Sequence, residues 1–561
     1  MRILIEEYQY DVSKVRDVLY GIDALENMEG RVSIHYVGYY YNMLLKDCVF
    51  ILPKVLLKDV DGQELVFGKY KPEDIANLDT FDSKERSFLY KFAVWIYRAI
   101  VVYKNDRRND TRIVCQSHIA QICNRGRRQS NTYLDILLSL IQFNQDNQSF
   151  FFFIIKNLHR GLNKINWQRT IATQTAIIQN EQAVYLNPVN KRRQINFDEE
   201  LLIIFFSILN YIGDTYGFPK DICCQFQLIT GKRFDTYLNG FGKTRLRQIK
   251  YKYFSDKALQ LWHLCYNFFD EAQQVMVSTE QRDYLLVKNF YVVFEAIIDE
   301  LIGDNPLPDG MEKQQEDGKI VDHLFTSQSL IAGENEQTYY IGDSKYYKIG
   351  HELGSQSIYK QYTYARNVIQ WNIDIFSNGD KSSSGVRLRD DVTEGYNILP
   401  NFFISAKLNE MFSYDDDNIE KTDRKRNRHK RVQFDNRLFD RDTLLLSHYD
   451  VNFLYVLSLY ARDNQSQKAA WKMKVRQCFC KEIQKWLDED YDFYFIKAKT
   501  GVDDKEYFKT HFQQLLGKFY APFEQYKDIY SLALEKGEKY QQENKLLLNQ
   551  LEDYFFVEKF N

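Results

Sequence analysis

Residues Tyr339–Tyr346 read YYIGDSKY, and this stretch decides the fold of the region around it. Its aromatic and β-branched residues predict a buried strand. Asp343 and Lys345 nevertheless stand where a buried strand would normally carry apolar residues. Because side chains alternate between the two faces of a strand, residues two apart project from the same face. The stretch therefore predicts an acid and a lysine side by side on one face of a buried strand.

A second predicted strand, Lys319–Phe325, comes before this one and reads KIVDHLF. Asp322 interrupts it in the same way. If the two strands pair with Asp322 beside Asp343, two carboxylates and the Lys345 ammonium converge within a few ångströms. Carboxylates that close repel each other and shift in pKa unless a cation lies between them.

Oxygen ligands of this kind favour Mg²⁺, with Mn²⁺ as an alternative, and water and a substrate phosphate complete the coordination. Such a site suits phosphodiester hydrolysis, because the metal polarises the phosphate and lowers the pKa of a water molecule. Lys345 would steady the charge that develops at phosphorus or orient the attacking water. The competing interpretation of Asp322, Asp343 and Lys345 is a structural ion pair at the ends of two strands.

Glu295 adds a further acid to this candidate site. It interrupts the apolar side of a predicted helix that contains Tyr291–Ile298, so it is placed to reach the metal or a metal-bound water. The alternative is a helix acid that faces solvent.

The chain has 561 residues, more than the roughly 250–300 at which single cores stop growing, so two to four domains are expected. The pattern predicts an α/β core within a chain of mixed α and β structure. Its four parts are a β-rich N-terminal unit over residues 1–80, a mainly helical middle domain over 81–280, the domain with the acids over 281–465, and a helical C-terminal region over 466–561.

Hydrophobic periodicity places the elements within these parts. A single helix is expected over Leu285–Ile302, and a solvated loop over Tyr414–Arg431. Within that loop, Arg424–Arg431 is strongly basic and is either a flexible surface loop or a contact for phosphates. The other expected helices are Phe88–Val102, Tyr133–Gln142, Glu199–Tyr211, Lys257–Phe269 and Ser357–Trp371, and the other expected strands are Thr338–Tyr346 and Ile398–Ser405.

Charge and composition exclude several classes of protein. The formal net charge of −3 argues against a uniformly basic coat for nucleic acid, although it leaves room for a local basic groove. The first residues show no secretory signal, and the longest apolar runs fall short of the ~18–20 residues that span a bilayer. A cytoplasmic protein without a membrane partner is expected. The eight cysteines contain no C-x₂-C pair, so no disulfide framework is expected either.

A GKT tripeptide at Gly242–Thr244 does not predict a nucleotide site. A phosphate-binding loop needs an earlier glycine where Tyr237 stands, because only glycine permits the tight backbone that cradles phosphates. No nucleotide is therefore expected as a cofactor of this chain. The basic residues Lys243, Arg245 and Arg247 are candidates for contact with a DNA backbone, and a solvated helix face is the equal alternative.

Three segments together resemble a known family. The run YYIGDSKYYK (Tyr339–Lys348), with IVDHLF upstream and SIYKQYTYA (Ser357–Ala365) downstream, resembles the LlaJI-type restriction endonucleases and the related McrC nuclease subunits. These belong to the PD-(D/E)xK superfamily. The segment GLNKINWQRT (Gly161–Thr170) is similar to a G-x-(N/D)-W-x-R-T segment of McrC-like proteins. The resemblance covers about 160–210 and 285–460.

The resemblance implies a PD-(D/E)xK restriction-endonuclease-like core with named site residues. Its catalytic acids fall on Asp322 and Asp343, its lysine on Lys345 and its helical glutamate on Glu295. Val321 replaces the proline that the superfamily often has before the first acid. On the next helix the family often has a glutamine followed four residues later by a tyrosine. Tyr364 matches that tyrosine, and Lys360 occupies the glutamine position with Gln361 beside it, so all three residues are candidates for DNA contact.

The resemblance also implies a function. The chain would be a Mg²⁺-dependent endonuclease for double-stranded DNA, of the restriction type that defends bacteria against phage, and so cytoplasmic in a bacterium. McrC-like nucleases work with a separate AAA+ NTPase subunit, and an McrB-like partner is expected here. The alternatives are a RecB- or Cas4-like repair nuclease and a non-catalytic DNA-binding or scaffold protein on a nuclease-like fold. The absence of a cysteine cluster for an iron–sulfur centre disfavours the Cas4 version.

Overall fold

The computed structural model describes most of the chain. The prediction of mixed α and β structure is confirmed, because helices and strands occur throughout the described ranges. The described residues are 2–20, 26–28, 30–42, 44–45, 47–76, 83–106, 113–116, 120–124, 127–131, 133–148, 154–158, 165–194, 200–216, 222, 226–253, 255–277, 284–307, 313, 321–331, 337–348, 354–377, 386–409, 411–421, 428–462, 464–521 and 528–560.

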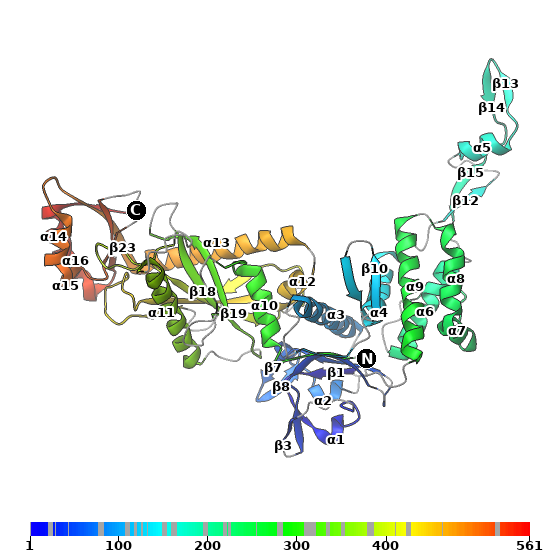
Figure 1. The fold of residues 1–561 in the computed structure, drawn as a ribbon, viewed down its shortest axis with the longest axis horizontal. Helices are drawn as coiled ribbons and strands as arrows, with labels where there is room; N and C mark the ends of the chain where they lie inside the picture. The colour runs from blue at the N-terminus through cyan, green and yellow to red at the C-terminus, as the bar shows by residue number, and fades with distance from the viewer. Residues whose placement is uncertain are drawn as a thin grey trace.

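The N-terminal unit is built on a five-stranded sheet in which β1 and β6 are parallel and the other neighbours antiparallel (Figure 1). Its strand order is β1 (Arg2–Ile5), β6 (Asp47–Leu52), β5 (Tyr36–Asn42), β16 (Tyr284–Lys288) and β9 (Ile113–Gln116). Around it lie β2 (Gln9–Asp11), β3 (Glu26–Met28), β4 (Arg31–Ser33), β7 (Leu57–Val60), β8 (Gln63–Val66), α1 (Val12–Val15) and α2 (Pro72–Ile75).

Strand β16 corrects the prediction of one helix over Leu285–Ile302. The helix, α10, begins at Tyr291, and residues 284–288 form a strand instead. The apolar run Leu285–Val287 suits either element when read locally. Its pairing with β5 and β9, which come from distant parts of the chain, decides for a strand, because a buried central strand satisfies its backbone on both edges.

The middle of the chain forms a helical unit beside this sheet. Three of the four helices predicted there lie within α3 (Ser83–Asp106), α4 (Tyr133–Asp146) and α9 (Asp256–Val277). The fourth, predicted over Glu199–Tyr211, corresponds to α6 (Glu200–Tyr216), and residue 199 lies outside the described residues. Short helices α7 (Lys232–Thr236) and α8 (Gly242–Ile249) and the hairpin of β10 (Ala120–Asn124) and β11 (Arg127–Asn131) complete it.

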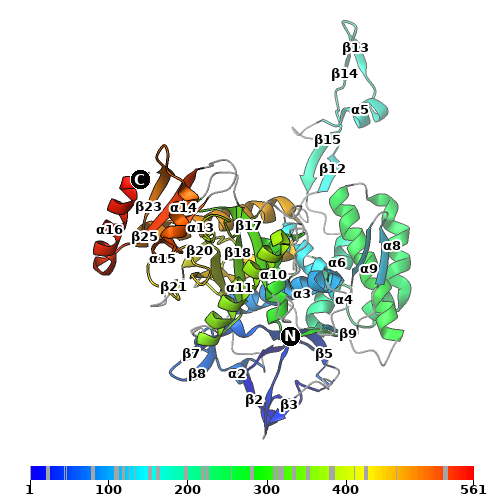
Figure 2. The ribbon, with the colours of Figure 1, turned by 60° about the vertical axis from the view of Figure 1, so that its left-hand side comes forward.

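An arm projects from the helical unit and stands clear of the rest of the molecule (Figures 1 and 2). It rises on the pair β12 (Ile154–Leu158) and β15 (Asn190–Gln194) and carries α5 (Trp167–Thr173) and the hairpin of β13 (Ile177–Gln179) and β14 (Gln182–Val184). The segment of the family resemblance from Gly161 to Lys164 lies outside the described residues, and its end, Trp167–Thr170, forms the first turn of α5.

A six-stranded mixed sheet forms the centre of the molecule. Helix α10 (Tyr291–Ile302) covers one face together with α12 (Phe453–Ala461) and α13 (Gln465–Asp490), and α11 (Ser355–Ser377) covers the other. Strands β17, β18, β19 and β22 follow one another across the sheet, and β20 and β21 pair with β22. Their bounds are β17 (His323–Gln328), β18 (Gln337–Lys345), β19 (Pro400–Lys407), β20 (Ile419–Lys421), β21 (Arg428–Arg431) and β22 (Leu444–Asn452).

The prediction of a loop over Tyr414–Arg431 is therefore wrong in part. Two short strands within it, β20 and β21, add antiparallel edges to β22. Of the basic segment, residues 424–427 lie outside the described residues, and Arg428–Arg431 forms β21. Lys430 on that strand pairs with Glu535 at 2.7 Å, so it is engaged inside the protein.

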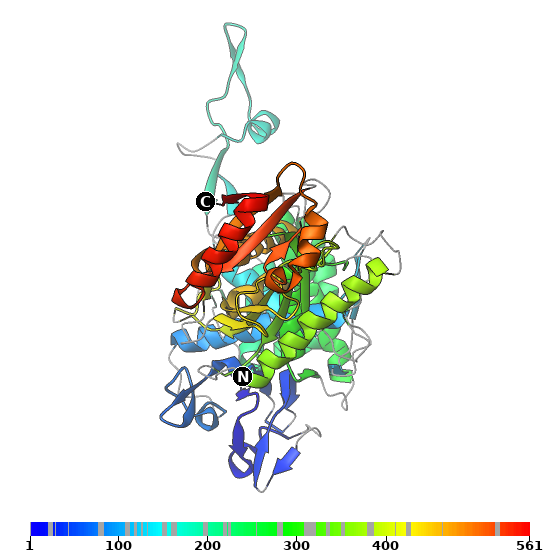
Figure 3. The same ribbon diagram turned by 90° about the vertical axis from the view of Figure 1, so that its left-hand side faces the viewer.

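The prediction of a helical C-terminal region over 466–561 is also wrong, because a domain of both helices and strands follows α13. Its elements in chain order are β23 (Tyr491–Ala498), α14 (Asp504–Thr510), α15 (Phe512–Leu515), β24 (Phe519–Tyr520), β25 (Ile529–Glu535), α16 (Glu538–Tyr554) and β26 (Phe555–Lys559). The strands are all antiparallel in the order β24-β25-β23-β26. This is a split β-α-β-β-α-β arrangement. The helices cover the outer face of the sheet (Figure 3).

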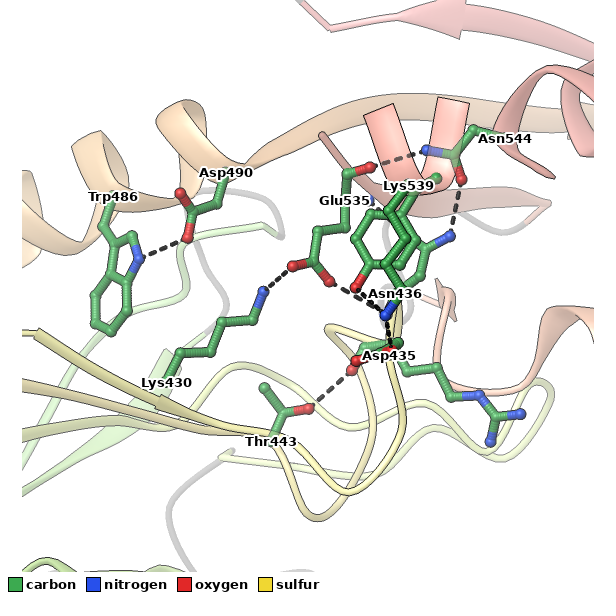
Figure 4. Close-up of polar contacts among 11 residues, drawn as sticks. Lys430, Asp435, Asn436, Thr443, Trp486, Asp490, Glu535, Lys539 and Asn544 are labelled. Carbon is green, nitrogen blue, oxygen red and sulfur yellow. Dashed lines mark hydrogen bonds and ion pairs between the residues drawn. The ribbon is translucent and has the colours of Figure 1, made fainter. Parts of the chain in front are cut away.

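A polar junction fixes the C-terminal domain to the central sheet (Figure 4). The Glu535 carboxylate, at the end of β25, accepts hydrogen bonds from Lys430 Nζ at 2.7 Å and from the Asn436 backbone at 3.2 Å. The Asn436 side chain accepts from the Glu535 backbone at 2.7 Å and donates to Asn544 Oδ1 at 2.8 Å. Since Asn436 is buried and each of these groups has a partner, the junction holds the two parts in one orientation.

Candidate metal and phosphate site

The pairing of β17 with β18 brings the two predicted acids together. The strands are antiparallel with His323 opposite Gly342, so Asp322, one residue before β17, comes beside Asp343. The predicted strand Lys319–Phe325 begins later than expected, at His323, and residues 319 and 320 lie outside the described residues.

Asp343 and Lys345 form a buried ion pair on one face of β18. Only 5% of Asp343 and 8% of Lys345 are exposed, and Lys345 Nζ contacts Asp343 Oδ2 directly. Lys345 Nζ also lies 5.0 Å from the ring centroid of Phe403 on the neighbouring strand β19. The predicted shared face is therefore observed, and packing fixes both side chains where water has little access.

Asp322 and Glu295 complete a group of carboxyls. Burial, followed by the charges of Asp343 and Glu295, raises the pKa of Asp322 far above its usual range. The Asp343 carboxyl hydrogen-bonds to Asp322 and strengthens this effect, and the Lys345 ammonium opposes it. Glu295 is half-buried on α10 and acts on Asp322 across the end of β17. The structure thus gathers all four residues that the sequence singled out.

Gly342 explains how β18 lies so close to its neighbours. A Cβ atom there would lie 2.1 Å from a ring carbon of Phe402. Phe402 is itself held between Phe325 and Phe479, whose ring centroids are 5.9 and 4.8 Å away. Because the ring has no room to retreat, only glycine permits the strand to place Asp343 at this depth.

A second polar group lies on the opposite face of the same strands. His323 is fully buried, and its Nε2 contacts Ser344 Oγ. Its Nδ1 faces Asp299 Oδ1 at 3.5 Å, and Lys313 Nζ lies 2.5 Å from the same oxygen. Burial lowers the pKa of His323 despite Asp299, which favours the neutral imidazole. These contacts tie β17, β18 and α10 together directly behind the carboxyls.

Sequence reasoning missed this second group. His323 and Ser344 each adjoin a predicted catalytic acid, and a polar residue on both faces of a buried strand was the available signal. Lys313 Nζ also donates to the Asp322 carbonyl oxygen at 2.7 Å, which fixes the backbone of the first acid. The group therefore positions the carboxyls from behind.

The oxygen donors of Asp322, Asp343 and Glu295 are of the kind that a hard divalent cation prefers. Among the described residues, no three histidine, cysteine or acidic side chains form a ready-made metal cage. Two adjacent carboxyls with a third acid farther out do suit Mg²⁺, which keeps several waters and takes one or two carboxylates plus phosphate. Burial and, after it, repulsion from Asp343 and Glu295 raise the pKa of Asp322, and a bound cation would relieve both effects. Asp322 and Asp343 fit as ligands, and Glu295 fits as a ligand or as the acceptor of a metal-bound water.

The residues predicted on the helix after β18 separate in the structure. Lys360 is exposed on α11. Gln361 is fully buried and donates to the Ile341 carbonyl at 3.1 Å and to Asn401 Oδ1 at 2.9 Å, so the prediction that it contacts DNA is wrong. Its amide instead joins α11 to β18 and β19. Tyr364 is half-buried and packs in the core between α11 and the sheet.

The basic residues of the helical unit do not join the carboxyl group. Lys243 pairs with Asp270, Arg245 pairs with Glu200, and Arg247 donates to the Tyr266 hydroxyl. These residues lie on α8, far from β18 in the molecule (Figure 1). The GKT tripeptide falls in the first turn of α8.

No protein-family model, curated protein or solved structure matches this chain. No helix in the part of the chain that the structure describes is long and apolar enough to cross a membrane.

Proposed function

We propose that this protein is a Mg²⁺-dependent DNA endonuclease of the PD-(D/E)xK type. One observation carries the proposal: Asp322, Asp343 and Lys345 converge at one end of the β17–β18 pair, with Glu295 approaching from α10. A purely structural ion pair needs one acid, and here a second carboxyl, that of Asp322, lies beside the Asp343–Lys345 pair, with Glu295 farther out. That excess of buried acid is costly without a cation, which favours a catalytic site over a structural one.

The residues of the chain would divide the work as follows. Asp322 and Asp343 would hold Mg²⁺, which supplies charge for the phosphate and lowers the pKa of a bound water. Glu295 would accept a hydrogen bond from such a water. Lys345 would leave Asp343 for the scissile phosphate and stabilise the charge that develops there, because an ammonium in a dry site acts strongly on a nearby oxyanion. His323, Ser344 and Lys313 would keep the two acids in register.

The proposed substrate class rests on the family resemblance of the central domain and not on a basic surface. The family resemblance points to double-stranded DNA, to restriction-type defence against phage in bacteria, and to a separate McrB-like AAA+ NTPase as partner. The arm supports a partner of some kind: Trp167, Ile171, Ile178 and Leu186 are more than half exposed there, although large apolar side chains normally avoid solvent in such groups.

The test is cleavage of covalently closed plasmid DNA in Mg²⁺ and in EDTA, with and without any AAA+ subunit that is encoded beside this protein. Wild type is compared with Asp343→Asn and Lys345→Met. Asp391→Asn is the matched control, because its carboxylate is 73% exposed on the same domain. We expect Mg²⁺-dependent cutting that falls about 10³-fold or more in both site variants and persists in the control.

Other results would redirect the assignment. If wild type never cuts, or if the site variants cut as well as the control, the catalytic assignment is wrong and a DNA-binding or scaffold role takes its place. Degradation of linear DNA from its ends, with closed circles left intact, would identify a RecB-like repair nuclease instead.

A further inference from the structure

The C-terminal sheet has one face that its own helices leave uncovered. Along β23, Tyr494, Ile496 and Ala498 point into the core under the helices. The alternate residues point the other way. This opposite face is covered in part by the central sheet, since Ala533 on β25 is buried in a cluster with Leu445. The remaining part belongs to β23 and to the edge strand β26.

Three phenylalanines gather on that remaining part. Phe495 is 40% exposed, Phe556 63% and Phe560 59%. The rings of Phe495 and Phe560 are 5.2 Å apart and nearly perpendicular. In the strand pairing Phe556 lies opposite Lys497, and Phe495 lies opposite Glu558. Three exposed rings on one strip of sheet form a patch, which isolated surface residues do not.

Lysines alternate with these rings. Lys497 is exposed on the same face as Phe495, two residues along β23. Lys499 follows it, with Nζ 5.7 Å from the Phe556 ring centroid. Glu558 on β26 shares this face with the two lysines, and Lys499 Nζ also donates to the Glu552 carbonyl oxygen at 2.5 Å. Lys559 points to the other face, where it pairs with Asp492 at 2.9 Å.

We propose that this strip, which we call the aromatic strip (Phe495, Lys497, Lys499, Phe556 and Phe560), binds unpaired bases of a single-stranded nucleic acid. Exposed rings on a sheet offer stacking surfaces for bases, and interleaved lysines offer contacts for phosphates. Bases inside a duplex are stacked on one another and are closed to such rings, so the strip selects single strands. The central sheet covers β25, so the exposed strip lies on β23 and on the edge strand β26.

The C-terminal sheet, which carries the strip, and the carboxyls lie at opposite ends of the β17–β18 pair. The turn after β17 packs against the C-terminal sheet through Ile331, whereas the carboxyls lie at the other end of the β17–β18 pair. Six residues of β18 between these ends correspond to roughly 20 Å. The strip therefore belongs to a domain that packs at the opposite end of the β17–β18 pair from the carboxyls. The binding goes beyond the proposed cleavage and does not depend on it.

The experiment measures fluorescence anisotropy of a labelled oligothymidylate of about a dozen nucleotides, in EDTA so that no cleavage occurs. The same sequence as a duplex is the competitor. The full chain is compared with Phe556→Ala/Phe560→Ala. Leu546→Ala is the matched control, because Leu546 is 58% exposed on α16, on the helical side of the same domain.

We expect the double variant to lose roughly 10-fold or more in affinity for the single strand for each ring removed. The control should bind as wild type does, and duplex affinity should be unchanged. Lys497→Gln should reduce the slope of log affinity against log salt by about 0.7. Because the rings are exposed, far-UV circular dichroism and the Tm should stay the same in all variants.

Two results would overturn the proposal: wild type fails to bind the single strand, or the double variant binds it as well as the control does. If light scattering shows that wild type dimerises and the double variant does not, the strip is a self-association surface instead. Since no step measures cleavage, an inactive nuclease site would leave this result intact, and the reverse also holds.

Discussion

The carboxyl site at the end of β18 and the aromatic strip of the C-terminal sheet depart from ordinary burial in opposite directions. Asp343 and Lys345 are charged and almost inaccessible, whereas Phe556 and Phe560 are apolar and mostly exposed. The difference lies in what each needs from the rest of the protein. Buried charges persist only where packing and fixed partners hold them, while exposed rings need little support. Changes under the carboxyls should therefore alter stability far more than changes on the strip.

The largest stability effect is expected from Gly342→Ala. The added methyl group meets the Phe402 ring, which has no room to move, so the free energy of unfolding should fall by about 1–3 kcal/mol or more. Denaturant unfolding measures this. Gly354→Ala is the control, because nothing lies within 4 Å of a Cβ atom there. Equal stability of the two variants would mean that the strand is not held at this depth by the glycine.

Metal binding should give the next largest effect. A cation that binds only the folded site stabilises it, by about 2.7 kcal/mol at a free concentration 100 times the Kd. We expect Mg²⁺ or Ca²⁺ to raise the Tm of wild type and of Asp391→Asn, and to leave the Tm of Asp343→Asn unchanged. A shift of equal size in Asp343→Asn would place the cation elsewhere.

Glu6 is another buried acid, and several hydrogen-bond donors surround its carboxyl group. Its effect on stability can be compared with that of the acids at the carboxyl site. Glu6 is fully buried and accepts from the Tyr346 hydroxyl at 2.6 Å and from the Lys54 and Phe290 backbones at 3.3 Å each. Tyr346 directly follows Lys345, so Glu6 joins the N-terminal unit to the end of the strand that carries the site. Burial is the main cause that raises the pKa of Glu6 above 4.5.

Because the pKa of the folded state exceeds that of the unfolded state, the contribution of Glu6 to stability is complete below about pH 4.5 and is lost as the pH rises through the folded value. Glu6→Gln should remove this loss. The stability of wild type relative to the variant should therefore decline as the pH rises from about 4.5 through the folded value. Unfolding curves at several pH values check this, and a parallel pair of stability profiles would refute it.

The smallest effect is expected on the aromatic strip itself. Phe556→Ser should change the free energy of unfolding by less than about 0.5 kcal/mol, because the ring is mostly exposed. The neighbouring Phe555 is 1% exposed and provides the contrast: Phe555→Ser should destabilise the domain clearly. A large loss from Phe556→Ser would show that the ring supports the fold.

The local sequence pattern was enough to predict features that depend on a single helix or strand. The two-residue spacing of Asp343 and Lys345 fixes their common face, and the helices α3, α4, α6 and α9 follow from their apolar periodicity. Local pattern failed where distant strands compete for a segment. Leu285–Val287 joined a sheet with β5 and β9, and the tail beyond Asp490 formed strands from segments such as Tyr491–Ala498, whose aromatic content was the available signal.

The sequence by itself determined which residue types are available for chemistry and which of them share a strand face, because the period of a strand is a local property. Only the tertiary structure decided that Asp322 comes beside Asp343, that His323, Ser344 and Asp299 support them from behind, and that Gln361 is buried. Each of these depends on strand register and on helix packing across the sheet. Register and packing are set by contacts between residues far apart in the chain, which no local pattern encodes.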